Sequence, residues 1–596
     1  MNKTFIDQEF NRLAHLLTSE MNQEGYWTGR LSGSALATAV AIVALKIVNH
    51  PADLPRITSG FDWLLNNINA DGSFGDTPES VGNVSTTLLC LAALTTCQVN
   101  GNAATTLRRM EAWLESRGIP SDPEHITRSV LAYYGKDLTF SVPILSMLHV
   151  GGIISASALR KVPGLPFELT LLPQSLFRFL NLRMVSYALP ALIGVGIYLH
   201  TRKKKGWFDL MAFRNIFIDP AIRKLNRLLP ESGGFLEAIP LTGFVAMCLV
   251  AAGKPGNPTV LEGAGFLRRQ QRDDGSWPID ADLSTWVTTL AVKALAGDPQ
   301  NPLSEEQKNK LREHLLGQQV RKVHPFNGAE PGGWGWTSTS GAVPDADDTP
   351  GAILALHALY SGSRREEEAL IMGCRWLTRL QNSDGGFPTF CRGWGKLPFD
   401  KSCADLTGHA LLALIRTQNR LGNTIGRATR TKMDQSILKA ICYLETHQHA
   451  DGSWIPLWFG NQMTDDQTNP VYGTARVCAY LHDSMKCLSP AHPFTGRLKP
   501  MVQKAEAFLT SQQNHDGSWG GKKGVQGTIE ETALAVAALA LNHPKPCEKG
   551  ILWIHHQPSL KSSPIGLYFA LLWYDEKMYP LVCYTEALRK MKSSIK

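Results

Sequence analysis

Paired cysteines and long apolar runs are both missing from this 596-residue sequence. Its 11 cysteines are scattered with no CxxC pair, so neither a zinc site nor a disulfide framework is indicated, and reduced thiols in a cytosolic compartment are expected. No stretch offers about 18 clean apolar residues, which argues against a membrane-spanning helix. The N-terminal segment MNKTFIDQEFNRLAHLL mixes charges into a helical pattern and lacks the apolar core of a signal peptide.

A strong charge of either sign is missing as well. The net charge of +8 is small for this length and well below the positive charge typical of a nucleic-acid-binding protein. No nucleic-acid partner is therefore expected. Hydrophobic residues make up 43% of the chain and charged residues 19%, which is typical of an ordered globular protein. The length exceeds that of one ordinary core and predicts two or more domains.

The most apolar stretch, Met184–His200, is short and contains Pro190, and a basic run follows it at 202–205. A buried core helix is the simpler interpretation. The alternative is a segment near a membrane-dipping surface, where the basic run would meet lipid phosphates.

A repeated pattern organises the chain: an apolar helix end is followed by Gln-x-x-x-Gly-x-aromatic. The clear copies are Gln271…Gly275…Trp277, Gln381…Gly385…Phe387, Gln448…Gly452…Trp454 and Gln513…Gly517…Trp519, and weaker copies end at Trp27, Phe74 and Phe235. The glycine suits the turn where a helix stops, the aromatic covers the helix end, and the Gln amide can bond unpaired backbone groups there. Amphipathic helices follow, for example at 285–295 and 404–414. The sequence therefore predicts an all-α fold of helix pairs stacked into a solenoid or closed into a toroid.

The placement of the repeats suggests two helical domains. Residues 1–253, which include a Pro-rich apolar insert at about 120–230, are predicted to form one domain together with the aromatic-rich segment 564–596. Residues 254–563 hold the strong repeats and are predicted to form the other domain.

Three carboxyl groups, Asp345, Asp347 and Asp348, stand at the mouth of an apolar helix in PGGWGWTSTSGAVPDADDTPGAILALHAL. They could cap the helix and place acids in its first turn. They could also bind a hard cation, since acidic clusters do so. The DDxxD pattern that holds magnesium diphosphate is absent, because no acid occupies the fourth position after Asp347.

The motif DADD resembles the DxDD motif of class II terpene cyclases, and the repeats resemble the QW motifs of squalene–hopene cyclases. QNSDGGF, CADLTGHAL and VYGT also have counterparts in order, so the resemblance covers nearly the whole chain. It implies two α/α-toroid domains and conversion of squalene into a hopene-type triterpene or its hydrated alcohol. It also implies that no metal or cofactor takes part and that the protein is monotopic on the cytoplasmic side of a membrane. Whether the protein forms a homodimer is left open.

The resemblance also assigns roles around the acids. An ordinary Asp would be only about 0.1% protonated at neutral pH, and a cluster of like charges in an apolar cavity raises the pKa of a carboxyl group. By resemblance, Asp347 donates the proton, and Asp345 and Asp348 complete its surroundings. His409 would form a hydrogen bond with Asp347 and make it a stronger acid. Asp405, four residues earlier on the same helical face, would orient His409.

Aromatic faces can stabilise a carbocation without trapping it. By alignment with the family, the candidate cavity residues are Trp286, Trp336, Phe390, Trp458 and Tyr472. The family usually has Phe in place of Trp336 and Tyr in place of Phe390. Near the C-terminus, non-aromatic residues occupy positions where the family has aromatics, which leaves the ring count and the final quench open: Ser563, Leu567 and Leu571.

Three rival functions remain. A cyclase could act on another polyprene, including a prenyl diphosphate, although no basic pocket for a diphosphate stands out. A helical toroid could serve as an inactive lipid-binding module. A protein prenyltransferase subunit would need a zinc set of Asp, Cys and His, and no convincing set stands out.

Overall fold

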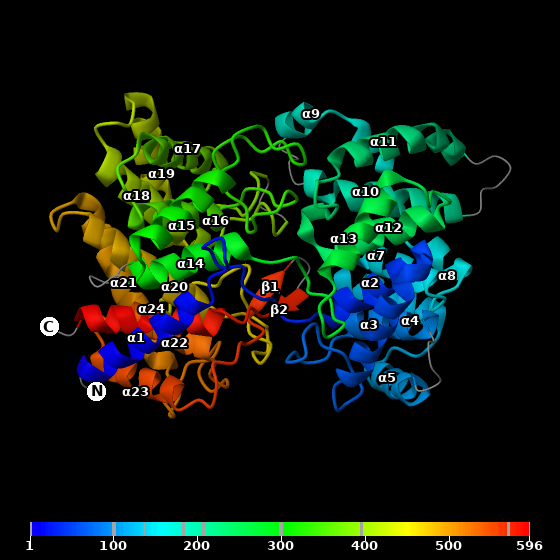
Figure 1. Cartoon of the computed structure of the whole chain (residues 1–596), viewed down its shortest axis with the longest axis horizontal. Helices are drawn as coiled ribbons and strands as arrows, with labels where there is room; N and C mark the ends of the chain where they lie inside the picture. Colours follow the sequence, from blue (N-terminus) through cyan, green and yellow to red (C-terminus); the bar gives the residue numbers. More distant parts are fainter. Residues whose placement is uncertain are drawn as a thin grey trace.

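The computed structural model describes residues 3–97, 103–135, 138–180, 185–203, 210–296, 302–393, 397–568 and 572–594. Within these ranges the chain forms 24 α-helices and a single two-stranded sheet, so the all-α prediction is confirmed. The helices form two lobes that lie side by side (Figure 1). We call them the acid lobe, made of α1 and α14–α24, and the insert lobe, made of α2–α13.

The acid lobe is a double ring of helices. Its six inner helices each pack on the next, and the last packs on the first, which closes the ring. They are α14 (Ser284–Ala296), α16 (Asp348–Ala358), α18 (Ala404–Leu421), α20 (Pro470–Cys487), α22 (Ile529–Leu539) and α24 (Tyr579–Ser594). The outer helices are α1 (Lys3–Ser19), α15 (Glu305–Gln318), α17 (Arg364–Leu380), α19 (Arg427–Thr446), α21 (Pro493–Gln512) and α23 (Pro544–His555).

The insert lobe repeats this plan with a smaller inner ring, closed where α12 packs on α2. The inner helices are α2 (Ala35–Val48), α4 (Val84–Thr96), α7 (Leu138–Val150), α10 (Val185–Arg202) and α12 (Ile239–Ala251). The other helices are α3 (Leu54–Asn66), α5 (Ala104–Ser116), α6 (Pro123–Tyr134), α8 (Ala156–Lys161), α9 (Gln174–Phe179), α11 (Ile218–Leu228) and α13 (Pro258–Gln270), and the 3-10 helices include η3 (Phe167–Leu171), η4 (Leu210–Phe217) and η5 (Phe235–Glu237).

The predicted domain boundaries differ from this arrangement at three places. The C-terminal helix α24 packs on α22, α14 and α1 in the acid lobe, although 564–596 was assigned to the other domain. Helix α1 packs on α24, so the chain begins in the acid lobe and crosses to the insert lobe before α2. Helix α13 packs on α12 and α2, so the insert lobe extends beyond residue 253. The packing of α24 on α14 joins segments far apart in the chain and leaves no local signal in the sequence.

The repeats form the hydrogen bonds that their sequence predicts. In one copy, the Gln448 amide donates to the carbonyl oxygens of Gly452 and Met501, both at 2.9 Å, and the Trp454 indole donates to the last turn of α19 at Leu444. Gly452 has a φ of +94°, a conformation that glycine adopts without strain. The same Gln bonds recur at Gln271, Gln381 and Gln513.

One further copy of the repeat does not match the spacing of the sequence pattern. The Gln319 amide donates to the carbonyl oxygens of Gly332 and Ala369, and the Trp334 indole donates to that of Leu315. The geometry matches the other copies, but 13 residues rather than four separate the Gln from its Gly. An inserted loop had therefore hidden the repeat.

Residues 185–200 of the apolar stretch lie in α10, and the side chains from Tyr187 onward are mostly buried, as the core-helix interpretation predicts. In the described part of the chain, no helix is long and apolar enough to span a membrane. Arg202 and Lys203 donate to backbone carbonyls of Ala251 and Val162, and the rest of the basic run lies outside the described residues.

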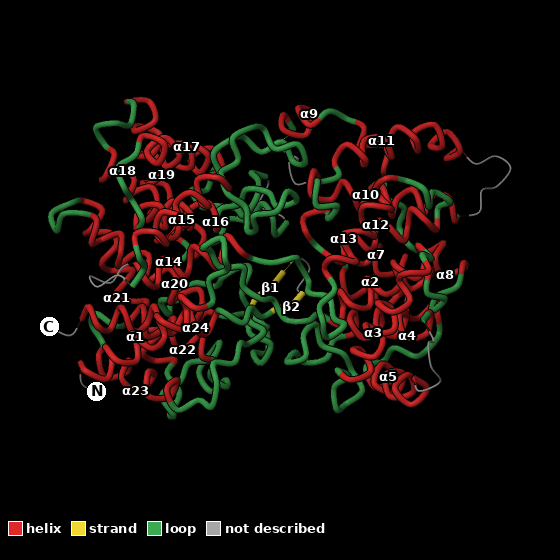
Figure 2. The backbone as a smooth tube through the Cα atoms, viewed as in Figure 1, coloured by secondary structure: helices red, strands yellow, loops and turns green. Residues whose placement is uncertain are grey.

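The sheet is a short antiparallel pair between the two lobes, an addition to the predicted all-helical fold (Figure 2). Strand β1 (Gly566–Tyr568) pairs with β2 (Leu572–Tyr574). An isolated bridge joins Gly566 to Phe459, so the sheet is fixed to a loop of the acid lobe.

Candidate active site

The three predicted acids lie together at the start of α16, but their environments differ. Oδ1 of Asp345 accepts hydrogen bonds from the backbone N–H groups of Asp347 at 2.8 Å and Asp348 at 2.7 Å, so Asp345 caps the first turn. Asp345 and Asp348 are buried, whereas 24% of the Asp347 side chain remains accessible. Of the three carboxyl groups, Asp347 is therefore the one placed to meet a substrate.

Asp345 and Asp348 form a coupled carboxyl pair. Burial raises the pKa of Asp345 to about 7, and burial together with the neighbouring Asp345 raises the pKa of Asp348 well above its ordinary value. One oxygen of each carboxyl is buried with no other donor among the described residues. Two such groups are stable together when they share a proton, which makes Asp348 the protonated partner.

Asp347 is bonded to a buried imidazole. Nδ1 of His409 lies 2.8 Å from Oδ1 of Asp347. Burial lowers the pKa of His409 to about 4, which outweighs the opposing effect of the hydrogen bond with Asp347. The imidazole is therefore neutral at neutral pH, and its Nδ1–H can donate to Asp347.

Two rings hold His409 in place. Tyr480 stacks on it with ring centroids 4.5 Å apart and an interplanar angle of 11°. Trp286 meets it edge-on, with centroids 6.2 Å apart. A sequence motif could not reveal Tyr480, because its contact depends on the packing of α18 against α20.

Asp405 occupies the predicted helix face but has a different partner. Its Oδ1 accepts a hydrogen bond from the thiol of Cys403, whose sulfur also accepts one from the backbone N–H of Leu457. Burial is the main cause that raises the pKa of Asp405 to about 6, and the nearby Asp347 adds to it. The expected orienting contact with His409 is not formed between these two described residues.

The candidate cavity aromatics fall into two groups. In the first, Phe390 lies 5.9 Å from Trp336 and 5.8 Å from Phe399, and Phe399 lies 6.2 Å from Trp458 between ring centroids. Tyr187 of α10 joins this group, with its ring 5.1 Å from Phe390 and its hydroxyl donating to the Phe390 carbonyl. The insert lobe thus contributes an aromatic that the sequence analysis missed.

The second group lies around Tyr472 and Trp286. Tyr472 stacks on Phe459 at 4.0 Å, and the Trp286 indole donates to the Tyr579 hydroxyl at 3.0 Å. Tyr574 lies 3.3 Å from the same hydroxyl. Leu567 is buried in β1, Ser563 donates its backbone N–H to Glu530, and Leu571 lies outside the described residues.

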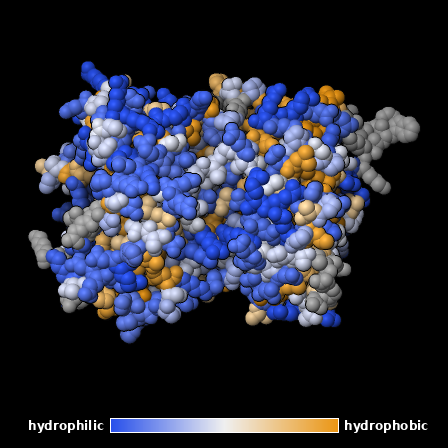
Figure 3. Space-filling model, in the orientation of Figure 1, coloured by the Kyte–Doolittle hydropathy of each residue, from blue (hydrophilic) through white to orange (hydrophobic). Residues whose placement is uncertain are grey.

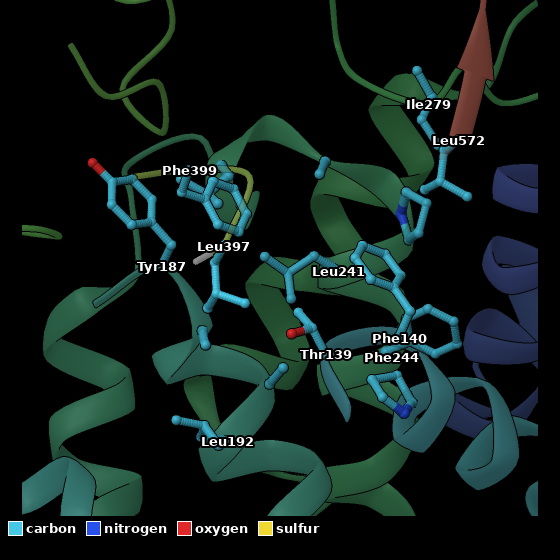
Figure 4. A pocket seen from close by; sticks show the side chains of 16 residues that line it. Thr139, Phe140, Tyr187, Leu192, Leu241, Phe244, Ile279, Leu397, Phe399 and Leu572 are labelled. Atoms are coloured by element: carbon cyan, nitrogen blue, oxygen red, sulfur yellow. The ribbon is translucent and has the colours of Figure 1, made fainter. Parts of the chain in front are cut away.

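An apolar pocket adjoins the first aromatic group. Its cavity volume is about 210 Å³, and it is walled by α7, α10 and α12 of the insert lobe, with Leu397, Phe399 and Leu572 from the other side. Figure 4 shows Tyr187 and Phe399 at one end and Phe140 and Phe244 at the other. Tyr187 and Phe399 belong both to the pocket and to the aromatic group, so the pocket borders that group.

Two family models match this chain. The model of the squalene–hopene cyclase N-terminal domain matches residues 10–148, and that of the C-terminal domain matches residues 283–541. A squalene–hopene cyclase of Alicyclobacillus acidocaldarius is 24% identical over 517 residues, covering 79% of this chain and 78% of that protein.

Other relatives are longer or more distant. A terpene cyclase–glycosyl transferase fusion protein of Humicola fuscoatra is 24% identical over 89% of this chain, and the chain spans only 45% of that protein. Among solved structures, the ent-copalyl diphosphate synthase of Streptomyces platensis matches 98% of this chain and 99% of its own, with a TM-score of 0.58 at 18% identity. That match shows a shared fold.

Proposed function

The chain belongs to the squalene–hopene cyclase family, and from that premise we propose that it starts ring closure by protonating a terminal alkene of a linear polyprene. Asp347 is the proton donor and squalene is the first candidate substrate. The product is a hopene-type triterpene or its hydrated alcohol.

One observation carries the proposal. Asp347 is the accessible member of the acid cluster, and its Oδ1 is bonded to a buried imidazole that is neutral at neutral pH. A carboxyl group held in this way can present its other oxygen, with a proton, to an apolar substrate. The hydrogen bond from Nδ1 then stabilises the carboxylate that proton transfer leaves behind.

The reaction balances without an added reagent. The O–H bond of Asp347 breaks, a C–H bond forms at the terminal alkene carbon, and a tertiary cation appears on its neighbour. Each further alkene attacks the cation, so one C–C bond forms and the charge moves along the chain. Loss of a proton gives a product of unchanged mass, and capture of water gives an alcohol.

Aromatic rings provide the surroundings that such cations need. Trp336, Phe390 and Trp458 present faces without a nucleophile, and each face can supply about 0.5–2 kcal/mol to a desolvated cation. The apolar pocket beside Tyr187 and Phe399 offers a path for a hydrocarbon toward these three rings. We call the space that they are proposed to surround the chamber.

The test is incubation of the detergent-solubilised protein with squalene, followed by mass spectrometry. A cyclic isomer, or one carrying an added water, is expected from the wild type, and the Asp347→Asn variant should form neither. Asp273→Asn, at an exposed aspartate in a repeat turn, is the matched control and should remain active. If the folded wild type leaves squalene and a panel of shorter polyprenes unchanged, the cyclase proposal is wrong and lipid binding becomes the alternative.

We also propose that the insert lobe rests on a membrane surface. Large apolar side chains are exposed on α9 and η4, with Phe179 85% accessible and Phe213 and Ile216 more than half accessible. Arg223 and Arg227 lie near this region on α11. Apolar patches also lie over the insert-lobe half of the face in Figure 3. Exposed apolar side chains beside basic ones are typical of monotopic binding to anionic lipid.

Vesicle flotation tests this second proposal. The protein should float with vesicles of phosphatidylcholine and phosphatidylglycerol, and Phe179→Asp combined with Ile216→Asp should abolish flotation. Leu552→Asp, at an exposed leucine on α23, is the control. Equal flotation of all three proteins would exclude the insert lobe as the membrane surface.

A further inference from the structure

A buried arginine lies close to two of the aromatic rings of the acid lobe. Arg476 on α20 is only 5% exposed. Its guanidinium carbon lies 5.0 Å from the ring centroid of Tyr480 and 5.6 Å from that of Trp286. The guanidinium is therefore held over aromatic faces inside the lobe, where its charge is poorly screened.

These two rings are the ones that contact His409. Tyr480 stacks on the imidazole, and Trp286 meets it edge-on. The positive charge of Arg476 is thus separated by one ring from the imidazole that bonds Asp347.

A second buried cation adds to this charge. Nζ of Lys293 lies 5.0 Å from the Tyr480 centroid and pairs with Glu586 at 2.8 Å. Burial lowers the pKa of Lys293, and Glu586 opposes that effect. Glu586 can offset one of the two cations.

We propose that Arg476 is a positioning residue for proton transfer: its fixed charge favours the neutral form of His409 and stabilises the Asp347 carboxylate as the proton leaves. This inference rests on the proposed function and names a residue that the sequence motifs do not include. Negative charge develops on Asp347 during the first step, and a cation already in place stabilises it without reorganisation.

The charged and titratable groups around His409 come from several helices. Asp347 lies before α16 and Lys293 lies on α14. Helix α20 contributes Tyr472, Arg476 and Tyr480, α24 contributes Glu586, and α18 itself contributes Asp405. Among them, Asp347 favours a charged imidazole, whereas Arg476 and Lys293 disfavour it.

The same charge limits the role of Trp286. A face already occupied by a guanidinium is less available to a carbocation. Loss of Arg476 should slow the first step and make the Trp286 face available to a cation.

The first test compares Arg476→Met and Arg476→Lys with the wild type. With whichever polyprene the wild type cyclises, Arg476→Met should lower kcat about tenfold with KM nearly unchanged. The alkaline limb of its kcat profile should move to higher pH, and Arg476→Lys should recover most of the rate. Arg117→Met, which removes an exposed guanidinium 5.2 Å from the Trp113 ring, is the matched control.

The second test does not require activity. In protein labelled with ¹⁵N-histidine, the His409 signal is assigned by its absence in His409→Phe. In Arg476→Met its titration midpoint should rise by about one pH unit relative to the wild type.

If the wild type cyclises nothing, the proposed function fails, and this titration still decides whether Arg476 favours the neutral imidazole. If Arg476→Met folds with an unchanged His409 titration and an unchanged kcat profile, the inference is overturned. If Arg476→Met does not fold, the same comparison is made with Arg476→Lys and Lys293→Met.

Discussion

Nδ1 of His409 lies 2.8 Å from Oδ1 of Asp347, although 62 residues separate the two in the sequence. Asp347 precedes α16 and His409 lies in the second turn of α18, and these two helices are neighbours in the inner ring. The pair is therefore a product of the packing of α16 against α18.

Replacing His409 by Phe should separate its hydrogen bond from its packing. The phenyl ring can keep the stack on Tyr480 but cannot donate to Asp347. We expect kcat for cyclisation to fall about 100-fold with KM nearly unchanged, measured by product formation under saturating substrate.

The control is His314→Phe. His314 is also a histidine stacked on a tyrosine, Tyr26 at 3.9 Å, but it lies on the outer helix α15. A His409→Phe variant that folds and cyclises at the wild-type rate would contradict the assigned hydrogen bond.

Replacing Glu530 by Gln should make the protein more resistant to alkaline pH. Burial raises the pKa of Glu530 to about 8, so the folded state keeps a proton that the unfolded chain releases above about pH 4.3. The stability contributed by Glu530 is complete below pH 4.3 and is lost as the pH rises through 8. Between pH 5 and pH 8.5, the variant should lose about 2–4 kcal/mol less stability than the wild type.

Chemical denaturation at the two pH values measures this difference. Glu262→Gln, at an exposed glutamate on α13, should behave like the wild type. Parallel losses for Glu530→Gln and the wild type would show that Glu530 is ionised in the fold.

Replacing Gln513 by Ala removes two bonds to backbone carbonyls, those of Gly517 and Pro546. Gly517 lies in the turn after α21 and Pro546 lies in the first turn of α23, so the side chain joins the two. We expect a loss of about 1–3 kcal/mol in unfolding free energy, measured by urea denaturation. Gln435→Ala, on an exposed face of α19, should change it by less than about 0.5 kcal/mol.

Replacing Trp336 by Phe should change the products more than the stability. The Trp336 indole N–H is buried, and no described residue accepts a hydrogen bond from it, so its removal leaves no new unpaired group. The smaller ring enlarges the chamber beside Phe390. We expect an altered product ratio by gas chromatography and mass spectrometry, with stability within about 1.5 kcal/mol of the wild type.

The matched change for Trp336 is Trp376→Phe, at a buried tryptophan on the outer helix α17. It should leave the product ratio unchanged. Identical products from Trp336→Phe and the wild type would remove Trp336 from the chamber wall.

The sequence predicts local features of this molecule well. A Gln, a Gly and an aromatic at fixed spacing mark helix ends because each acts within one turn, and the bonds of Gln448 and Trp454 follow directly. The acids beside an apolar helix left capping and cation binding open, and only the family resemblance singled out Asp347. The copy at Gln319 was missed because a loop lengthens its spacing, although its glycines and tryptophans were visible in the sequence.

Contacts between distant segments could not be predicted in this way. Arg476 lies four residues after Tyr472 on an apolar helix, and nothing local shows that it faces Trp286. Asp405 is four residues before His409, but its hydrogen bond goes to Cys403 because the loop at Leu457 holds that thiol in place. The alignment suggested neither partner.

The closure of the acid lobe by α24 on α14, with α1 outside it, has a consequence for biosynthesis. The insert lobe is one continuous segment that can fold while translation proceeds. The inner ring of the acid lobe runs from α14 to α24, so it stays open from the synthesis of α14 until α24 is made. Contacts between segments far apart in the chain form slowly. The unfinished lobe is therefore the part most dependent on chaperones, and a chain that stops before residue 579 cannot close it.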